Sequence, residues 1–297
     1  MLDTILVPLD GSSLSERALP IATTLAQGLG AKLVLVRSAS PAAGVDTIET
    51  EFLAVQEAEA YLADVAGRLG EQGLEVETVT TDLEPCDGIL LEARLHQADL
   101  IVMCTHGRSG RELWQHGSVA EDVLGYSEIP LLLVRPTDAA DQAPLQGSTW
   151  LVPLDGSAFA ESVLPAASTL AAALDATLLL VRVVERQLYD EPGDDEFFNT
   201  AQQVEEEQQG EAERYLAGLS ARLASSGVGA RLETRVRLGS AADMILDEAM
   251  ASDAGLVAMA THERTGLGAL LMGNVARQVF ERDTRPMLVV RPNGNAQ

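Results

Sequence analysis

The feature that most constrains the fold of this chain is an internal repeat that runs through its whole length. Residues 5–12 (ILVPLDGS) recur as residues 150–157 (WLVPLDGS), and residues 130–136 (PLLLVRP) recur as residues 286–292 (PMLVVRP). Other matched segments between these, such as MCTH and MATH, keep the same order in both halves. Because chance similarity does not preserve order over a whole chain, the repeat predicts two copies of one domain joined head to tail.

The repeat divides the 297 residues into two domains and a connecting segment. We predict a first domain at residues 1–137, a linker at 138–148 and a second domain at 149–294. The linker is polar, contains proline and glycine and lacks apolar periodicity, which is typical of a connection between domains. The second copy is longer mainly at residues 187–209, whose many Asp, Glu and Gln residues indicate a loop leading into a solvated helix.

The strongly acidic composition excludes several classes of partner. The formal net charge is −25, and Lys32 is the only lysine, whereas nucleic acids and anionic membranes bind clustered positive charge. We therefore expect neither of them as a partner. No apolar run approaches the ~20 residues that span a bilayer, and the first residues lack the basic region and cleavage site of a secretion signal. A cytoplasmic protein is expected.

Within each copy, short apolar runs alternate with stretches of helical periodicity. In the first copy the expected strands are residues 4–9, 32–37, 75–80, 100–104 and 131–135. The expected helices lie between them, the first with a capping box at Ser13 and Glu16, and the others at about residues 51–71, 87–96 and 118–126. Apolar strands of this kind are typical of parallel sheets buried on both faces. The alternation predicts a doubly wound, Rossmann-like α/β fold.

Ligands of doubly wound sheets bind beyond the carboxyl ends of the strands, where the strand order reverses. In the first copy this edge carries Asp10 and a glycine-rich loop at residues 104–118. Gly107 and Gly117 would allow the backbone to approach an anion closely. The helix that begins at Ser118 would offer free N–H groups to a phosphate. The loop also carries two arginines that would neutralise the phosphate charge, Arg108 and Arg111.

These residues also have an ordinary structural interpretation. Ser118 and Glu121 have the spacing of a capping box, which explains the serine without a ligand. The loop glycines fit simple turns, and Asp10 fits a cap or turn before the first helix. We expect the two histidines that follow the fourth strands, His106 and His262, to pack or hydrogen-bond within their loops.

The motifs in this order and spacing resemble the universal stress protein family. They are Val-Pro-Leu-Asp-Gly-Ser after the first strand, Thr-His-Gly followed nine residues later by Gly-Ser, and the closing Pro-Leu-Leu-Leu-Val-Arg-Pro. The resemblance implies an adenine nucleotide alpha hydrolase-like fold, with two doubly wound parallel sheets of five strands in the order 3-2-1-4-5. It also implies that the fifth strands pair, so that the tandem chain forms an intrachain pseudo-dimer.

Part of that family binds adenine nucleotide through a Gly-x-x-Gly, nine residues, Gly-Ser/Thr pattern. The resemblance implies that the first copy binds ATP or AMP, with Mg²⁺ entering only with the nucleotide, and that Asp10 and the backbone near Ser38 meet the base or ribose. Cys104 stands where the first glycine of the pattern belongs, and its side chain would crowd the ribose. The residues expected to bind in the first copy are Pro8, Asp10, Ser38, Met103, Cys104, Gly107, Arg108, Gly117, Ser118 and Val119.

The second copy departs further from the nucleotide-binding pattern. Glu263 replaces a glycine at the phosphate-facing turn, and a carboxylate ~4 Å from a phosphate charge costs about 4 kcal/mol at an effective dielectric of about 20. Arg277 partly offsets this cost. We therefore expect poor triphosphate binding there, with adenosine or a monophosphate as the alternative ligand. The weaker set of expected residues is Pro153, Asp155, Val183, Ala260, Gly273 and Asn274, of which the last would cap a helix.

Two functions from different classes remain open. The first is an adenine-nucleotide-binding stress-response sensor or regulator, with the nucleotide held mainly by the first domain and read by an unknown protein partner. The second is a scaffold that binds no nucleotide and acts through protein–protein interaction. We expect no enzyme beyond a slow ATPase, because no nucleophile with an oriented base is readable. No metal site is expected, because no His/Cys cluster has metal spacing. A homodimer of the tandem chain is compatible with both functions.

Overall fold

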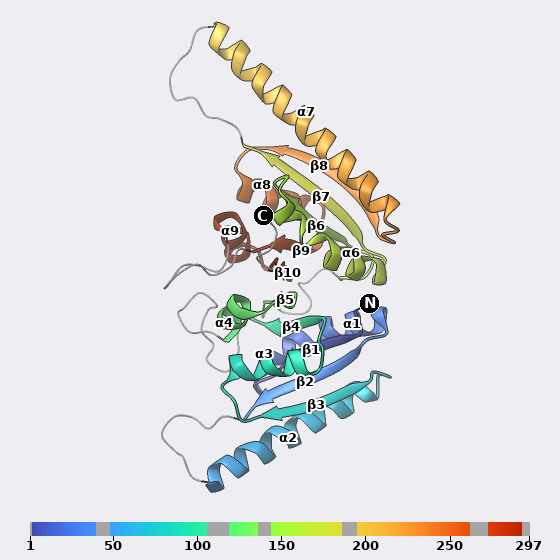
Figure 1. Cartoon of the computed structure of the whole chain (residues 1–297), viewed down its shortest axis with the longest axis vertical. Coiled ribbons are helices and arrows are strands. Elements are labelled where there is room, and N and C mark those ends of the chain that lie inside the picture. Colours follow the sequence, from blue (N-terminus) through green and yellow to red (C-terminus); the bar gives the residue numbers. More distant parts are fainter. Residues whose placement is uncertain are drawn as a thin grey trace.

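The structure is a computed structural model that describes residues 2–39, 48–105, 119–135, 144–185, 195–261 and 273–292, with residues 195–201 described for the backbone only. The molecule is elongated, and its two halves meet at strands β5 (Leu131–Val134) and β10 (Met287–Val290) (Figure 1). The long helices α2 (Ile48–Gly70) and α7 (Asp195–Ser225) lie at the two far ends.

The two halves repeat the same alternation of strands and helices. The first half contains β1 (Thr4–Pro8), the 3-10 helix η1 (Ser15–Ala18), α1 (Leu19–Leu29), β2 (Lys32–Ser38), α2, β3 (Val76–Thr81), α3 (Pro85–Leu95), β4 (Leu100–Cys104), α4 (Val119–Tyr126) and β5. The second half contains β6 (Thr149–Leu154), α5 (Ala158–Glu161), α6 (Leu164–Ala173), β7 (Thr177–Val184), α7, β8 (Arg231–Leu238), α8 (Ala241–Ala251), β9 (Ala254–Ala260), α9 (Asn274–Arg282) and β10. The α/β class is therefore confirmed.

The strand order within each half is the expected one, β3-β2-β1-β4-β5 and β8-β7-β6-β9-β10. The two sheets are not separate, however, because β5 and β10 pair antiparallel and form one sheet of ten strands. Leu132 lies opposite Leu288 in this pairing. Both strands are short and largely buried. Joining them satisfies backbone groups that would otherwise be left at two open sheet edges.

Reciprocal arginine contacts fasten the two halves where the sheets join. The guanidinium of Arg135 donates to the carbonyl of Phe280 and lies 4.7 Å from the centre of the Phe280 ring. Arg291 donates to the carbonyl of Gly125 over 2.5 Å. Both carbonyls lie in the last turn of a helix of the opposite half, where carbonyls lack intrahelical partners and a cation is favoured. The arginines of the repeated Val-Arg-Pro segment therefore hold the pseudo-dimer together.

The core has two apolar layers, one on each face of the sheet, and each layer contains residues from both halves. Helices α1, α2, α6 and α7 cover one face, with Leu25 and Leu170 buried in the same cluster. Helices α3, α4, α8 and α9 cover the other face. Trp150 is completely buried in the first layer and donates its indole N–H to the carbonyl of Leu145. Shared layers make the two copies one structural unit.

Three further sequence expectations bear on the fold. The capping box at Ser13 and Glu16 is wrong, because the hydroxyl of Ser12 accepts the N–H of Ser15, whereas the carboxylate of Glu16 binds side chains of α2. Within the described part of the chain, none of the helices has the length and apolar character needed to traverse a bilayer. The predicted linker falls partly on residues 136–143, which lie outside the described residues.

Candidate functional site

The first strand of each copy ends in a turn built on an aspartate. The carboxylate of Asp10 accepts the backbone N–H of Ser12 over 2.9 Å and its hydroxyl over 2.6 Å. Asp155 binds Ser157 in the same way over 2.9 and 2.5 Å. In the second copy the Ser157 hydroxyl also accepts the N–H of Ala160 and so caps α5. The turn interpretation of Asp10 therefore holds, and both carboxylates stand at the carboxyl edge of the sheet.

These turns require glycine after the aspartate. Gly11 has a φ of 84° and Gly156 a φ of 86°, a backbone conformation that side chains with a Cβ rarely adopt. A Cβ on Gly156 would also lie 3.4 Å from Nη1 of Arg182. The Asp-Gly-Ser segment of the repeat thus has a local structural cause that does not depend on a ligand.

Asp155 is held in its ionised form. Its partial burial alone would raise the pKa, but the two hydrogen bonds from Ser157 and the nearby charge of Arg182 outweigh burial and lower the pKa below its ordinary value. Arg182 also contacts the carbonyl of Leu154 at 3.5 Å. The second copy therefore presents a stable negative charge at the strand end.

In the first copy, the described residues of the expected site lie around this same edge. Pro8 is the last residue of β1. Ser38 is the last residue of β2 and donates its hydroxyl to the carbonyl of Leu83 over 2.7 Å. Val119 is the first residue of α4. Met103 and Cys104 end β4 and are 5% and 7% exposed. Cys104 is thus largely buried in the strand end.

The remaining first-copy residues lie outside the described part of the chain. They are Gly107, Arg108, Gly117 and Ser118, together with His106 and Arg111. His262 and Glu263 of the second copy lie outside it as well. The phosphate-binding loop therefore stays a prediction from sequence.

In the second copy, the structure brings all the expected residues together. They line one cavity of about 500 Å³ at the carboxyl edge of the sheet. Pro153 and Asp155 come from the end of β6, Val183 from β7, Ala260 from β9, and Gly273 and Asn274 from the start of α9. The cavity lies where β6 separates β7 from β9, which is the point of strand-order reversal.

Several apolar residues of this cavity were missed from the sequence. Ala241 and Ile245 reach it from the first turns of α8, and Phe159 reaches it from α5. The available signal was topological, since α8 follows β8 and begins at the same edge of the sheet. The missed residues, with Val181 and Met259, make the lining predominantly apolar.

The start of α9 differs from the expectation. Asn274 is the first helical residue and does not cap the helix, because its amide oxygen accepts from Gln278. Gly273 occupies the cap position without a side-chain bond. Arg277, which was expected to offset Glu263, pairs with Glu281 at 3.3 Å and does not line the cavity. The described residues that line the cavity include no basic residue.

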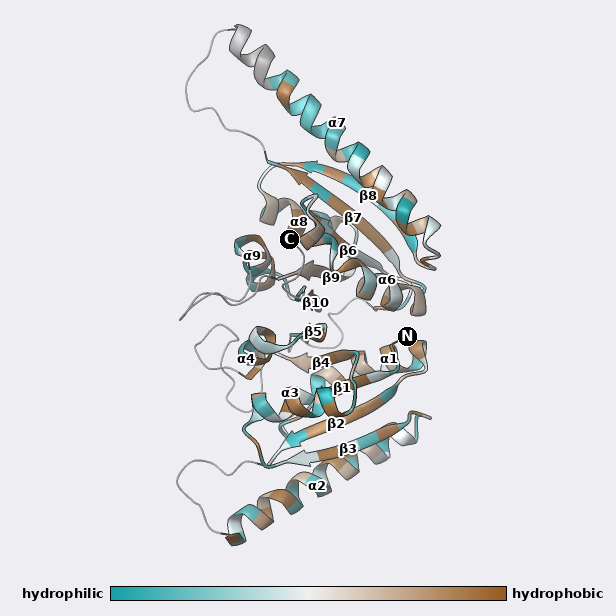
Figure 2. Ribbon diagram, in the orientation of Figure 1, coloured by the Kyte–Doolittle hydropathy of each residue, from teal (hydrophilic) through white to brown (hydrophobic). Residues whose placement is uncertain are grey.

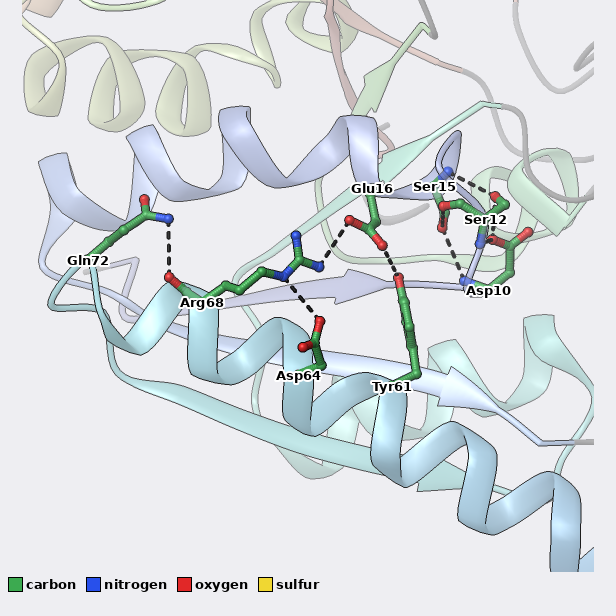
Figure 3. A network of polar contacts seen from close by, with 8 residues as sticks. All are labelled: Asp10, Ser12, Ser15, Glu16, Tyr61, Asp64, Arg68 and Gln72. Carbon is green, nitrogen blue, oxygen red and sulfur yellow. Dashed lines mark hydrogen bonds and ion pairs between the residues drawn. The ribbon is translucent and has the colours of Figure 1, made fainter.

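A second polar network lies beside the aspartate turn, and Figure 3 shows it in the first copy. Glu16 of η1 accepts the hydroxyl of Tyr61 over 3.0 Å and the guanidinium of Arg68 over 3.1 Å, both from α2. Burial and the Glu16 carboxylate raise the pKa of Tyr61, so the phenol stays protonated as a donor. Sequence reasoning missed this network because its members are about 45 residues apart.

The second copy repeats that network at matching positions. Glu161 accepts the hydroxyl of Tyr215 over 3.0 Å and the guanidinium of Arg222 over 2.6 Å. Recurrence of all three residue types at the matching positions of the repeat was the available signal. The network ties the segment after the first strand to the long helix in each copy.

The two cysteines are not bonded to each other. Cys86 is half-buried, and burial, with the charges of Asp122 and Asp87, raises its pKa to about 11, so its thiolate is disfavoured. In the described ranges, His, Cys, Asp and Glu side chains form no group suited to a metal ion.

The geometry defines a tandem α/β protein with a strand-end cavity between an Asp-Gly-Ser turn and a helix start. A family model described as "Universal stress protein family" matches residues 1–135 and again residues 149–291. The chain belongs to the universal stress protein family.

Curated relatives match single copies of the repeat. Universal stress protein YxiE of Bacillus subtilis is 29% identical over 148 residues, which cover 46% of this chain and all of that protein. Universal stress protein MJ0531 of Methanocaldococcus jannaschii is 33% identical over 138 residues, which cover 44% of this chain and 81% of that protein.

A solved structure matches the tandem arrangement as a whole. A universal stress protein of Archaeoglobus fulgidus superposes with a TM-score of 0.70 and 17% identity, covering 99% of this chain and 98% of that chain. At this identity the likeness shows the fold alone.

Proposed function

We propose that this protein is an adenine-nucleotide-binding regulator that acts in the cytoplasm and carries no catalytic role of its own. The observation that carries the proposal is the cavity of about 500 Å³ at the strand-order reversal of the second copy. Its volume falls in the range of small-molecule sites, and its apolar walls with a few polar groups have the usual composition of such sites. The first copy adds the glycine-loop pattern.

The residues around the second cavity fit the nucleoside part of a ligand. Val181, Val183 and Met259 offer apolar surface to a base, and the ionised Asp155 can accept hydrogen bonds from ribose hydroxyls. The free N–H groups at the start of α9 suit a single phosphate. The described residues that line the cavity include no basic one, so a triphosphate would gain no neutralising charge from them.

We therefore assign different ligands to the two sites, according to the charge of the residues around each site. The first copy holds ATP or AMP through Gly107, Gly117, Ser118 and Arg108, with Mg²⁺ bound only through the nucleotide. The second copy holds adenosine or AMP. Binding at either site would alter the surface that a protein partner reads.

Two glycine variants at equivalent positions test this division. Gly117→Asp places a carboxylate at the phosphate loop of the first copy and should abolish ATP binding in calorimetric titration. Gly273→Asp, its match in the second copy, should leave ATP binding nearly unchanged and weaken AMP binding at the second site. Equal loss of ATP binding in both variants would contradict the division.

A scaffold without nucleotide is the second candidate function. The observation that favours it is Cys104, whose largely buried side chain ends β4 where the nucleotide-binding pattern has glycine. Nucleotide released from freshly purified protein and identified by mass separates the two functions. A protein that carries none and ignores added ATP, AMP and adenosine would favour the scaffold.

A further inference from the structure

The first part of helix α2 extends beyond the body of the protein. Every buried residue of α2 lies from Ala58 onward, at Ala58, Leu62, Val65 and Leu69. Residues 48–57 contain no buried side chain. At about 1.5 Å per residue this overhanging segment is about 15 Å long. We call residues 48–57 the α2 arm, and Figure 1 shows its end at the lower extremity of the molecule.

The α2 arm carries an exposed apolar stripe. Ile48 is 87% exposed, Phe52 61% and Leu53 50%, and Val55 is half-buried. Ile48, Phe52 and Val55 follow one another at helical spacing and lie on one face. In Figure 2 the tip of α2 has the brown of hydrophobic residues. Large apolar side chains gathered at an exposed site indicate a contact surface.

The matching arm of the second copy shows that the fold does not need this stripe. The buried Ala212 and Leu216 of α7 correspond to Ala58 and Leu62 of α2. With this alignment, the positions of the four apolar residues of the α2 arm are occupied in α7 by Gln202, Glu206, Glu207 and Gln209. Because the polar arm of α7 also lies in a continuous helix, the apolar residues of the α2 arm are not needed for the helix to form.

The charges that flank the stripe restrict what can cover it. Four exposed glutamates surround it, and residues 48–60 contain no basic residue. The glutamates are Glu49, Glu51, Glu57 and Glu59. A second copy of the chain would bring two such acidic rims together, and an anionic membrane would repel the rim, because like charges in contact are unfavourable. A complementary surface has an apolar ridge with positive charge on both sides.

We propose that the α2 arm is the docking site for a basic amphipathic helix of a partner protein. The apolar ridge of that helix covers the face of Ile48, Phe52 and Val55, with Leu53 at its margin, and its Lys and Arg residues face the glutamate rim. Helices recognise one another in this way through apolar positions at helical spacing. Residues 202–211 of α7, which match the α2 arm, carry no such stripe, so we expect one partner helix per chain.

A peptide probe tests the proposal on the full chain. The probe is a helical peptide of about five turns with Leu on one face and Lys elsewhere, and its control has the same composition in an order that scatters the Leu residues. Wild-type protein should bind the patterned peptide at one site, at least about tenfold more tightly than the control, because burial of a single large apolar side chain is worth roughly that factor.

The decisive variant gives the α2 arm the residues of α7, as Ile48→Gln, Phe52→Glu and Leu53→Glu. It should weaken binding of the patterned peptide about tenfold or more, although its two added negative charges would strengthen a purely electrostatic contact. Circular dichroism checks that the helix content is unchanged, which the polar arm of α7 leads us to expect. Unchanged or tighter peptide binding would overturn the proposal.

The reciprocal variant places the stripe on the second copy, as Gln202→Ile, Glu206→Phe and Glu207→Leu. The number of peptide sites should rise from one to two, and a number that stays at one would overturn the claim that the stripe is the recognised element. Sedimentation of the wild type and its binding to anionic vesicles complete the test. Self-association or vesicle binding that the first variant abolishes would identify a different occupant.

Discussion

The two copies differ most on the helical face that covers their outer strands. In the first copy, Glu92 and Glu77 flank His96 at 3.4 Å, and Glu77 also pairs with Lys32 at 3.1 Å. Glu77 and Lys32 are partly exposed, whereas the side chains of Glu92 and His96 are only 12% and 19% exposed. In the second copy, the residue that matches Glu92 is Glu248, which is completely buried. The two copies share their residues near the strand ends and at the junction of β5 and β10. The residues of this outer face, in contrast, differ in their charge pairing and in their burial.

In the second copy, this face of α8 forms ion pairs with the edge strand β8. Glu248 of α8 receives Arg235 at 2.6 Å and Arg237 at 2.9 Å, both from β8. The first copy has Val79 and Thr81 at these two positions of β3. Helix α8 also lines the second cavity with its first turns. The ion pairs of the buried Glu248 carboxylate with two partly exposed arginines therefore position one wall of the second site, whereas Val79 and Thr81 of the first copy cannot form such pairs.

Removal of the buried carboxylate should have the largest effect on stability. Glu248→Ala leaves Arg235 and Arg237 on β8 without their partner. Because these arginines are 45% and 33% exposed and can be solvated, the free energy of unfolding should fall by about 1–2 kcal/mol, less than for a fully buried pair. The matching change Glu92→Ala should cost less than about 1 kcal/mol, because its contact is a longer one, with His96 at 3.4 Å, and involves no arginine. Urea unfolding of both variants measures the difference. Similar costs would contradict the comparison.

A second, smaller contrast concerns the contact between α1 of the first copy and α6 of the second. Gly28 of α1 faces α6, and a Cβ there would lie 2.6 Å from Cδ2 of Leu174 and 3.0 Å from the carbonyl oxygen of Ala173. Gly28→Ala should therefore destabilise the protein by about 1 kcal/mol through overpacking. Gly67→Ala, in α2 with no neighbour within 4 Å, should stabilise it by about 0.5–1 kcal/mol because alanine favours helix.

Thermal unfolding of Gly28→Ala and Gly67→Ala measures these two changes in stability. The midpoints should move in opposite directions, although both changes add the same methyl group to a helix. If Gly28→Ala raised the midpoint as much as Gly67→Ala, the close packing of α1 against α6 would not be a feature of the folded protein.

The sequence alone predicted the parts of the molecule that depend on local pattern. Apolar runs located the strands, and α2 was expected at 51–71 against the observed Ile48–Gly70. The repeat placed the two Asp-Gly-Ser turns at equivalent strand ends. The resemblance to a known family supplied the strand order and the pairing of the fifth strands.

Contacts between distant segments were beyond the reach of local pattern. Glu16 was assigned to a capping box because Ser13 lies three residues before it, whereas its carboxylate binds Tyr61 and Arg68 across the fold. Asn274 has the residue type of a cap but starts the helix itself. In both cases the residue type and its spacing fit a helix cap. A contact with other side chains, or the local backbone conformation, decides the structure instead, and sequence spacing carries no information about either. The walls of the second cavity, such as Ile245, are likewise set by which helices cover that edge.

The smallest expected effect concerns the aspartate turn of the second copy. Arg182 lies near Asp155 there, while its counterpart Arg37 lies 4.9 Å over the ring of Tyr61 in the first copy. The folded pKa of Asp155 lies below its ordinary value of 3.8. The ionised carboxylate therefore contributes stability above about pH 4, and this contribution is lost as the pH falls through the lower folded pKa.

Asp155→Asn should accordingly lower the free energy of unfolding by less than about 1 kcal/mol at neutral pH, since the group is largely exposed. The difference from wild type should shrink as the pH is lowered below 3.8. Ser157→Ala removes the hydroxyl that donates to the carboxylate over 2.5 Å and should reduce the same acid dependence. Chemical unfolding across the acid range measures both variants. A stability gap for Asp155→Asn that stays constant with pH would show that the turn depends on the shape of the side chain, and that its charge contributes nothing.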